Sequence, residues 1–206
     1  MFNNSIEAQN EFEKCWLDPA YTQIELDDID VNRALTNYTT NKPISFTQVM
    51  LWDMEKKKAW NPGDYIPYVV RKGSAQSWGK QPCMITDGEI FVRSSQQKQW
   101  LHPEIYEEVY EEVYVNNKDQ IVTFLGVKTL PGCSEELTPM QPLFHVQHAV
   151  GGDEERPLNK WRIVHLTKVK DAQLMAHFKG FNDSKTLPGF IKVYIEKDLH
   201  VMIEHK

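Results

Sequence analysis

Short β-rich segments separated by turn sequences make up most of this chain from residue 43 onward. The clearest turn is Asp87-Gly88, which lies between the β-rich segments 82–86 and 89–94. Asp-Gly readily adopts the positive φ angles of a two-residue turn, so this pair predicts an antiparallel hairpin. The same reasoning predicts further strands at 121–130, 144–150 and 161–169. We therefore expect a sheet that is mostly antiparallel.

Two helices are predicted before these strands. Asn4 or Ser5 can cap the first, and apolar residues then recur at helical spacing until Asp18-Pro19. The second is expected over 24–38, where the apolar residues are roughly periodic. A third short helix, capped by Asp171, is expected at 171–178. The predicted class is α+β, with N-terminal helices packed on the sheet.

Several other segments are assigned from local pattern. The expected elements are a β-rich run at 44–52, a solvated connection at Lys56-Lys57-Lys58, a helix at 104–114 and a terminal hairpin of 189–195 with 199–204. The helix at 104–114 is preferred because Val and Tyr recur every four residues, whereas a strand would place Glu and Val on one face. We expect one domain over 1–206, with a helical segment at 1–40 and a β-rich body at 42–206. A small barrel-like module at 42–111 is one form that this body can take.

Composition excludes several classes of protein. The net charge is −6, so the chain as a whole lacks the basic footprint of a nucleic-acid-binding protein. Its three cysteines are widely spaced and form neither a disulfide framework nor a zinc motif. No signal peptide and no apolar run long enough to span a membrane are recognisable, so we expect a soluble protein in the cytoplasm. No cofactor motif is recognised, and the oligomeric state is left open.

One segment resembles a known group of proteins. Lys42-Pro43-Ile44 leads to Trp52, followed by Pro62-Gly63-Asp64-Tyr65, Asp87-Gly88-Glu89 and the run Pro103–Glu111. In this order the motifs resemble small bacteriophage-encoded proteins with a Lys-Pro-Val…Trp strand, a Pro-Gly-Asp-Trp/Tyr turn and a closing Pro-Asp-Ile-Phe-Glu-x-Thr-Tyr-Glu. The likeness covers residues 42–111 and leaves 112–206 without a counterpart. It implies a phage or mobile-element origin, with a host-cytoplasm location, but no activity.

Two histidines are the candidates for catalysis. If Val150 pairs with Lys160 in a hairpin of 144–150 with 161–169, His145 faces His165 across the strands. Two opposed imidazoles with Thr167 nearby could share a proton or ligate a metal, although a register slip of one residue would separate them. Ordinary strand histidines on a half-exposed face are the alternative. We predict no metal site from these residues.

The densest group of unexplained residues lies between residues 71 and 100. Basic side chains there alternate with tryptophans, an arrangement that can stack on flat groups or grip anions. The candidate ligand-binding residues are Arg71, Lys72, Trp78, Arg93 and Trp100. A solvated loop with its tryptophans folded inward is the alternative.

No complete catalytic set is found, so the sequence favours a non-catalytic binding protein. Its partner would be a host protein or a small ligand held by the 71–100 surface. The alternatives are a metal-dependent or acid/base hydrolase that uses His145 and His165, and a structural component of a virion.

Overall fold

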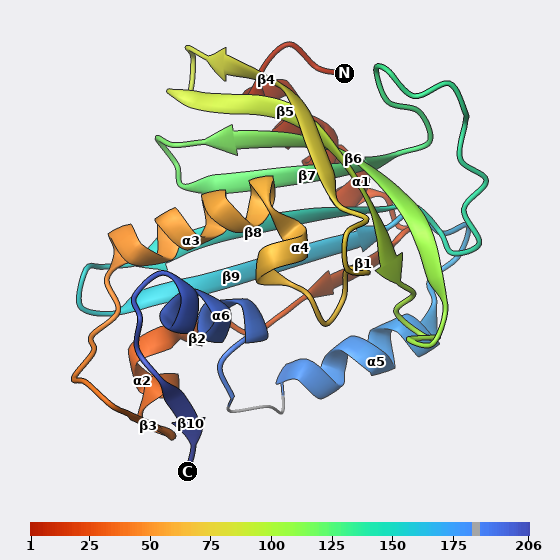
Figure 1. Ribbon diagram of the computed structural model, residues 1–206. Helices are drawn as coiled ribbons and strands as arrows, with labels where there is room; N and C mark the ends of the chain where they lie inside the picture. The colour runs from red at the N-terminus through yellow and green to blue at the C-terminus, as the bar shows by residue number, and fades with distance from the viewer. Residues whose placement is uncertain (183–185) are drawn as a thin grey trace.

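The computed structural model describes residues 1–182 and 186–206, and its centre is one large antiparallel sheet (Figure 1). The strand order is β1-β9-β8-β7-β6-β5-β4, and the short strand β2 also pairs with β9. The strands are β1 (Thr22–Glu25), β2 (Ile29–Asp30), β4 (Gln76–Cys83), β5 (Gly88–Lys98), β6 (Tyr106–Asn116), β7 (Ile121–Val127), β8 (Phe144–Gly152) and β9 (Pro157–His165). The predicted α+β class with an antiparallel sheet is confirmed.

Segment 42–111 does not form a barrel-like module of its own. Its strands β4, β5 and β6 belong to the same sheet as β7, β8 and β9. The path of paired strands ends at β4 on one side and at β1 on the other, so the sheet stays open. The expected barrel-like module was wrong, because β6 pairs with β7 and, in the described part of the chain, no pairing between β6 and β4 closes the segment into a barrel.

Helix α1 (Ser5–Leu17) covers one face of the sheet (Figure 1). The side chain of Asn4 caps it by accepting a hydrogen bond from the backbone N–H of Glu7 at 2.9 Å, as the sequence predicted. Phe12 of α1 lies in an apolar cluster with Tyr114 and Val164 from the sheet. Helix α1 therefore packs on this face of the sheet.

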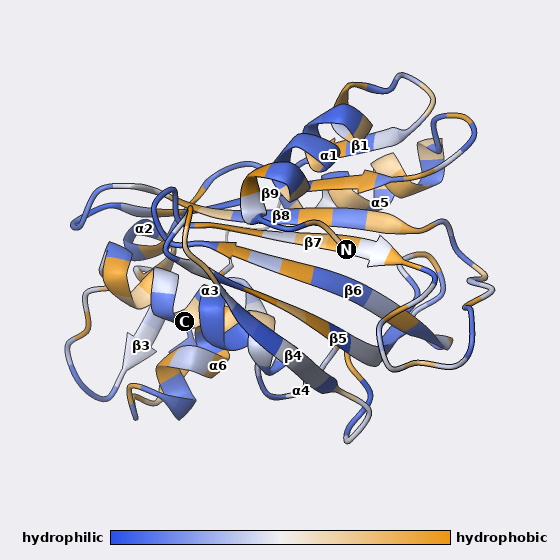
Figure 2. Cartoon of the chain, turned by 90° about the horizontal axis from the view of Figure 1, so that it is seen from above, coloured by the Kyte–Doolittle hydropathy of each residue, from blue (hydrophilic) through white to orange (hydrophobic). Residues whose placement is uncertain are grey.

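The other face carries most of the remaining helices. Figure 2 shows α3 and α6 on the opposite side of the sheet from α1. The remaining elements are α2 (Val31–Leu35), α3 (Gln48–Trp60), α4 (Pro62–Tyr65), α5 (Ala172–Asn182) and α6 (Gly189–Lys197), with the small sheet of β3 (Tyr38–Thr40) and β10 (Ile203–His205). The larger apolar core lies on this face, between the sheet and α3, α4 and α6.

The helix predicted at 104–114 is strand β6. As a strand it does place Glu107, Val109, Glu111 and Val113 on one face, and both carboxylates are buried there. Glu111 is paired with Arg93 at 2.7 Å, and Glu107 accepts hydrogen bonds from Gln99 Nε2 and the backbone N–H of Met140, both at 3.1 Å. Partners far away in the sequence thus satisfy the buried carboxylates. The four-residue recurrence of Val and Tyr therefore predicted the wrong element.

Three further predictions of secondary structure were wrong. Segment 24–38 holds β1, β2 and the short α2, because its first half pairs with the edge of β9. Segment 44–52 leads into α3, which Thr47 caps by accepting from the N–H of Met50 at 3.1 Å. Segment 189–195 is helix α6, and β10 after it pairs with β3. By contrast, the predicted helices at 5–17 and near 171–178 are present as α1 and α5.

Strands β8 and β9 pair in a register one residue away from the one assumed. Val150 lies opposite Asn159, not Lys160, so His145 faces Val164 and His165 faces Phe144. Because side chains alternate across a strand, this slip places the two histidines on opposite faces of the sheet. Throughout the described residues, every helix is too short or too polar to cross a lipid bilayer.

Candidate functional site: a cavity between the sheet and its helices

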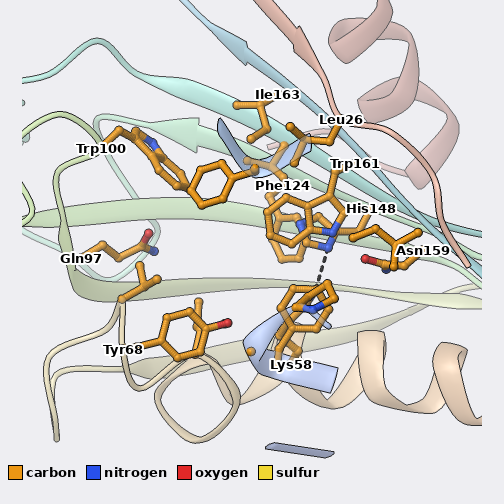
Figure 3. Close-up of a pocket in the computed structure, with 18 of the residues that line it drawn as sticks. Leu26, Lys58, Tyr68, Gln97, Trp100, Phe124, His148, Asn159, Trp161 and Ile163 are labelled. Carbon is orange, nitrogen blue, oxygen red and sulfur yellow. Dashed lines mark hydrogen bonds between the residues drawn. The ribbon is translucent and has the colours of Figure 1, made fainter. Parts of the chain in front are cut away.

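A cavity of about 430 Å³ lies between the sheet and the helices of the larger core (Figure 3). Strands β5 to β9 supply its floor, and α3, α6 and the segments next to α4 and α5 supply its rim. The floor residues alternate along their strands, so only every second residue reaches the cavity. A space of this size suits a small organic molecule.

Aromatic side chains form much of the wall. Trp161 of β9 stacks on Phe190 of α6, with ring centroids 5.3 Å apart and planes at 14°. Trp100 lies at the far end, where its ring meets Phe144 at 5.9 Å between centroids. Phe124 of β7 lines the space between them. These walls offer flat apolar surfaces on opposite sides of the cavity.

A polar cluster interrupts this apolar lining. Lys58 of α3 places its Nζ 2.6 Å from His148 Nδ1 (Figure 3). The same Nζ lies 2.7 Å from Glu55 Oε2. Asn159 Nδ2 donates to the other oxygen, Glu55 Oε1, at 2.8 Å. Lys58, His148 and Asn159 line the cavity, and Glu55 lies wholly buried behind them. We call Glu55, Lys58, His148 and Asn159 the polar cluster.

Burial and mutual charge set the protonation of the polar cluster. Burial and, to a smaller extent, the charge of Arg93 lower the pKa of Lys58 to about 8, against the opposing effect of the Glu55 carboxylate. For His148, burial and the charge of Lys58 lower the pKa to about 4. Burial alone would raise the pKa of Glu55, but the charge of Lys58 and the contact with His148 outweigh it and lower that pKa. Near neutral pH the cluster therefore holds a carboxylate, a neutral imidazole and an amine that is easily deprotonated.

A second ion pair lies beside the polar cluster. Arg93 Nε donates to Glu111 at 2.7 Å, and its guanidinium also donates to the backbone oxygen of Ala59 at 3.0 Å. The guanidinium carbon sits 4.3 Å from the centroid of the Phe124 ring. These three contacts fix the Arg93 side chain in place, so it contributes a fixed positive charge to the cavity wall.

The rim of the cavity is formed around Tyr68 and the start of α6. A Cβ placed on Gly189 would come within 2.6 Å of the Tyr68 ring, so only glycine permits this close approach. Burial raises the pKa of Tyr68. Leu26, Asp27 and Phe181 line the opposite side. Phe181 is 49% exposed, which places a large apolar ring at the entrance.

The structure divides the five predicted ligand-binding residues into two groups. Arg93 and Trp100 line the cavity. Arg71 and Lys72 are exposed, and Arg71 lies over the Tyr106 ring at 4.5 Å. Trp78 is partly buried on the edge strand β4, where its indole N–H donates to the backbone oxygen of Pro131 at 2.9 Å. The 71–100 surface predicted from sequence is thus not one continuous site.

The candidate catalytic residues are not brought together. His145 lies on the α1 side of the sheet, where its Nδ1 accepts from the backbone N–H of Gly126 at 3.1 Å. His165 lies on the other face among Trp100, Phe144 and other rings. Thr167 bonds to the Thr22 hydroxyl at 2.9 Å. Across residues 1–182 and 186–206, no group of three or more His, Cys, Asp or Glu side chains gathers in a way that could hold a metal.

Sequence reasoning missed the residues at the heart of the cavity. The sequence predicts that Lys58 lies in a solvated connection, and it does not single out Glu55. Once the segment is taken as a helix, Leu51 and Met54 define its buried side, and positions 55 and 58 continue that side. A Glu and a Lys three residues apart on a buried helical stripe are the signal that could have found them.

Comparison with known proteins gives the fold. No family model and no curated protein matches the chain. Among solved structures it is similar to the ZhuI aromatase/cyclase from Streptomyces sp. R1128, with a TM-score of 0.52 and 8% identity over 85% of this chain and 95% of that one. It is also similar to major latex-like protein 151 from Panax ginseng, with a TM-score of 0.45 and 14% identity over 81% of this chain and 99% of that one. The likeness to the aromatase/cyclase shows a shared fold.

Proposed function

We propose that this protein binds a small, largely apolar molecule in the cavity between the sheet and helices α3 and α6. The observation that carries the proposal is the cavity itself, about 430 Å³ and walled by Trp161, Phe190, Phe124 and Trp100. Proteins usually fill their interiors to the density of organic crystals, so a space of this size inside a core calls for an occupant. Between a host protein and a small ligand, which the sequence left open, the cavity favours the small ligand.

The energetics of such binding come mainly from apolar burial. At about 25 cal/mol per Å², a ligand that buries about 300 Å² of apolar surface gains roughly 7 kcal/mol before the loss of its free motion is counted. The aromatic walls favour a flat molecule, because stacked or edge-on rings add to simple burial. Similarity to solved structures at such low identity does not decide the ligand, so the proposal depends on the residues that line the cavity in this chain.

A fluorescence titration tests the proposal. Trp161 and Trp100 line the cavity, so an uncharged apolar probe such as N-phenyl-1-naphthylamine should quench tryptophan emission and itself brighten on binding. Val146→Phe places a ring in the cavity and should weaken binding at least about tenfold, equivalent to about 1.4 kcal/mol. The matched control is Val49→Phe on α3, where the side chain is 67% exposed and binding should be unchanged. Equal affinities of the two variants would rule out this cavity as the site.

A further inference from the structure

A buried amine sits in the wall of a mostly apolar cavity, and this is the feature of the cavity that most needs an explanation. Lys58 is 3% exposed, and its Nζ lies 3.8 Å from the centroid of the Phe190 ring and 5.4 Å from that of Trp161. Lysine is among the residues least often buried, because its ammonium loses much of its hydration. An apolar ligand in the cavity would lie directly against this group.

Groups that can take a proton from Lys58 lie within hydrogen-bond distance. His148 Nδ1 is 2.6 Å from Nζ, Glu55 Oε2 is 2.7 Å from it, and these two acceptors are themselves 3.1 Å apart. With the imidazole proton on Nε2, Nδ1 is free to accept from the ammonium. Glu55 lies behind Lys58, and the charged or titratable groups that line the cavity with it are His148, Arg93, Glu111, Tyr68 and Asp27.

We propose that Lys58 is a nucleophile that forms an imine with the aldehyde or ketone group of an apolar ligand held in the cavity. This inference rests on the proposed function and narrows its ligand to a carbonyl compound. A lysine desolvated among apolar groups and placed beside another cation is the setting in which amines become nucleophilic in proteins. Burial against the rings of Phe190 and Trp161 gives Lys58 the first condition, and the charge of Arg93 acts in the same direction, while the paired Glu55 carboxylate opposes both.

The chemistry balances without an added reagent. The fraction of Lys58 that is neutral near pH 7 adds through its nitrogen to the carbonyl carbon, while the C=O π electrons move to oxygen. His148 Nδ1 then accepts one proton from the new ammonium and passes it to that oxygen, which gives a neutral carbinolamine. The nitrogen lone pair then forms the C=N bond as the hydroxyl group leaves, and the remaining N–H proton leaves with it as water. Glu55 keeps the imidazolium paired during these transfers, and hydrolysis by the reverse path releases the ligand.

The neighbouring lysine provides an internal comparison. Lys57 precedes Lys58 on α3 but points outward, where it pairs with Asp198 at 2.7 Å and with Asp53 at 2.8 Å. Its hydrogen bonds to these two carboxylates raise the pKa of Lys57, whereas burial lowers that of Lys58. Lys58 therefore has far more free amine near neutral pH, although Lys57 is the more exposed of the two.

Reductive trapping tests the inference. The protein is incubated at about pH 7 with naphthalene-2-carbaldehyde and sodium cyanoborohydride, which reduces an imine to a stable amine, and the modified residue is located by peptide mass mapping. We expect one dominant adduct, with a mass increase equal to the aldehyde less one oxygen atom, on Lys58, at least about tenfold above Lys57. Labelling spread over exposed lysines with Lys58 unmodified would overturn the proposal.

A non-reactive analogue separates this inference from the proposed function. Naphthalene-2-methanol has nearly the same shape but cannot form an imine, and its binding is followed by quenching of tryptophan emission. If the alcohol binds but the aldehyde is not trapped on Lys58, the imine is wrong and the binding function stands. If neither binds, both fail. Lys58→Met should abolish the adduct while a circular dichroism spectrum reports its folding, and Lys57→Met should retain the adduct.

Discussion

At the scale of single residues, the polar cluster raises the question of how a core tolerates charge. Glu55 is wholly buried and accepts from Lys58 and Asn159, while His148 contacts both Lys58 and Glu55. Each charged group thus depends on the others, because a buried ion left alone loses its hydration without compensation. The cluster is expected to act as one energetic unit.

A double-mutant cycle measures that dependence. Glu55→Gln leaves the Lys58 ammonium buried without a counter-ion, and Lys58→Met leaves the Glu55 carboxylate in the same position. Each single change should lower the free energy of unfolding by about 3 kcal/mol. The double variant should lose clearly less than the sum, since neither charge remains. Urea unfolding at neutral pH followed by circular dichroism gives the three values, and strict additivity would contradict the assignment of the cluster as a unit.

At the scale of elements, the pairing of β5 with β6 leaves no room for a side chain at Gly88. Gly88 begins β5, directly after the turn residue Asp87, whose φ is 49°. A Cβ placed on Gly88 would come within 1.8 Å of the backbone oxygen of Val115 in β6. A backbone carbonyl in a paired strand cannot move aside, so the hairpin and its neighbour both need glycine here.

Two glycine-to-alanine substitutions give opposite expectations. Gly88→Ala should destabilise the protein by about 2 kcal/mol, because the new methyl group collides with β6. Gly180→Ala is the matched control, since Gly180 lies in helix α5 with no atom within 4 Å of its added Cβ, and alanine there should stabilise by about 0.5–1 kcal/mol. Thermal unfolding monitored by circular dichroism compares them. A Gly88→Ala protein as stable as the parent would show that β5 and β6 lie farther apart.

Local signals in the sequence account for some elements and not for others. The Asn4 cap and the hairpin near Asp87-Gly88 could be predicted because their chemistry is contained within a few residues. The predicted two-residue turn was wrong, since Gly88 pairs with Cys83 and the loop of the hairpin is residues 84–87. Strand β6 could not be predicted, because the buried Glu111 is satisfied by Arg93 and Gln97, which lie eighteen and fourteen positions earlier in the chain. Trp100 and Arg93 were found as ligand-binding candidates by their residue type. Lys58 was missed because its burial depends on where α3 packs against β8 and β9.

At the scale of the whole molecule, three buried histidines link stability to pH on both faces of the sheet. His145 lies on the α1 side, while His148 and His165 lie on the cavity side. Burial lowers the pKa of each of the three to about 4. In an unfolded chain a histidine has a pKa of about 6.5. Between these two values the unfolded state binds more protons, so stability is full above about pH 6.5 and falls as the pH drops toward 4.

The size of this effect predicts acid unfolding at a mild pH. Each histidine contributes up to about 3 kcal/mol across the window, so three together approach the whole stability of an ordinary domain. Urea unfolding at a series of pH values should show the free energy of unfolding falling steeply below about pH 6. His165→Phe tests the cause, because neither ring nitrogen of His165 has a partner among the described residues and its neighbours are aromatic. The free energy of unfolding of this variant should fall less steeply than that of the parent, by about 1.4 kcal/mol per pH unit.

The exposed His102→Gln serves as the control and should follow the parent curve. A His165→Phe curve parallel to the parent would show that other groups govern the acid response.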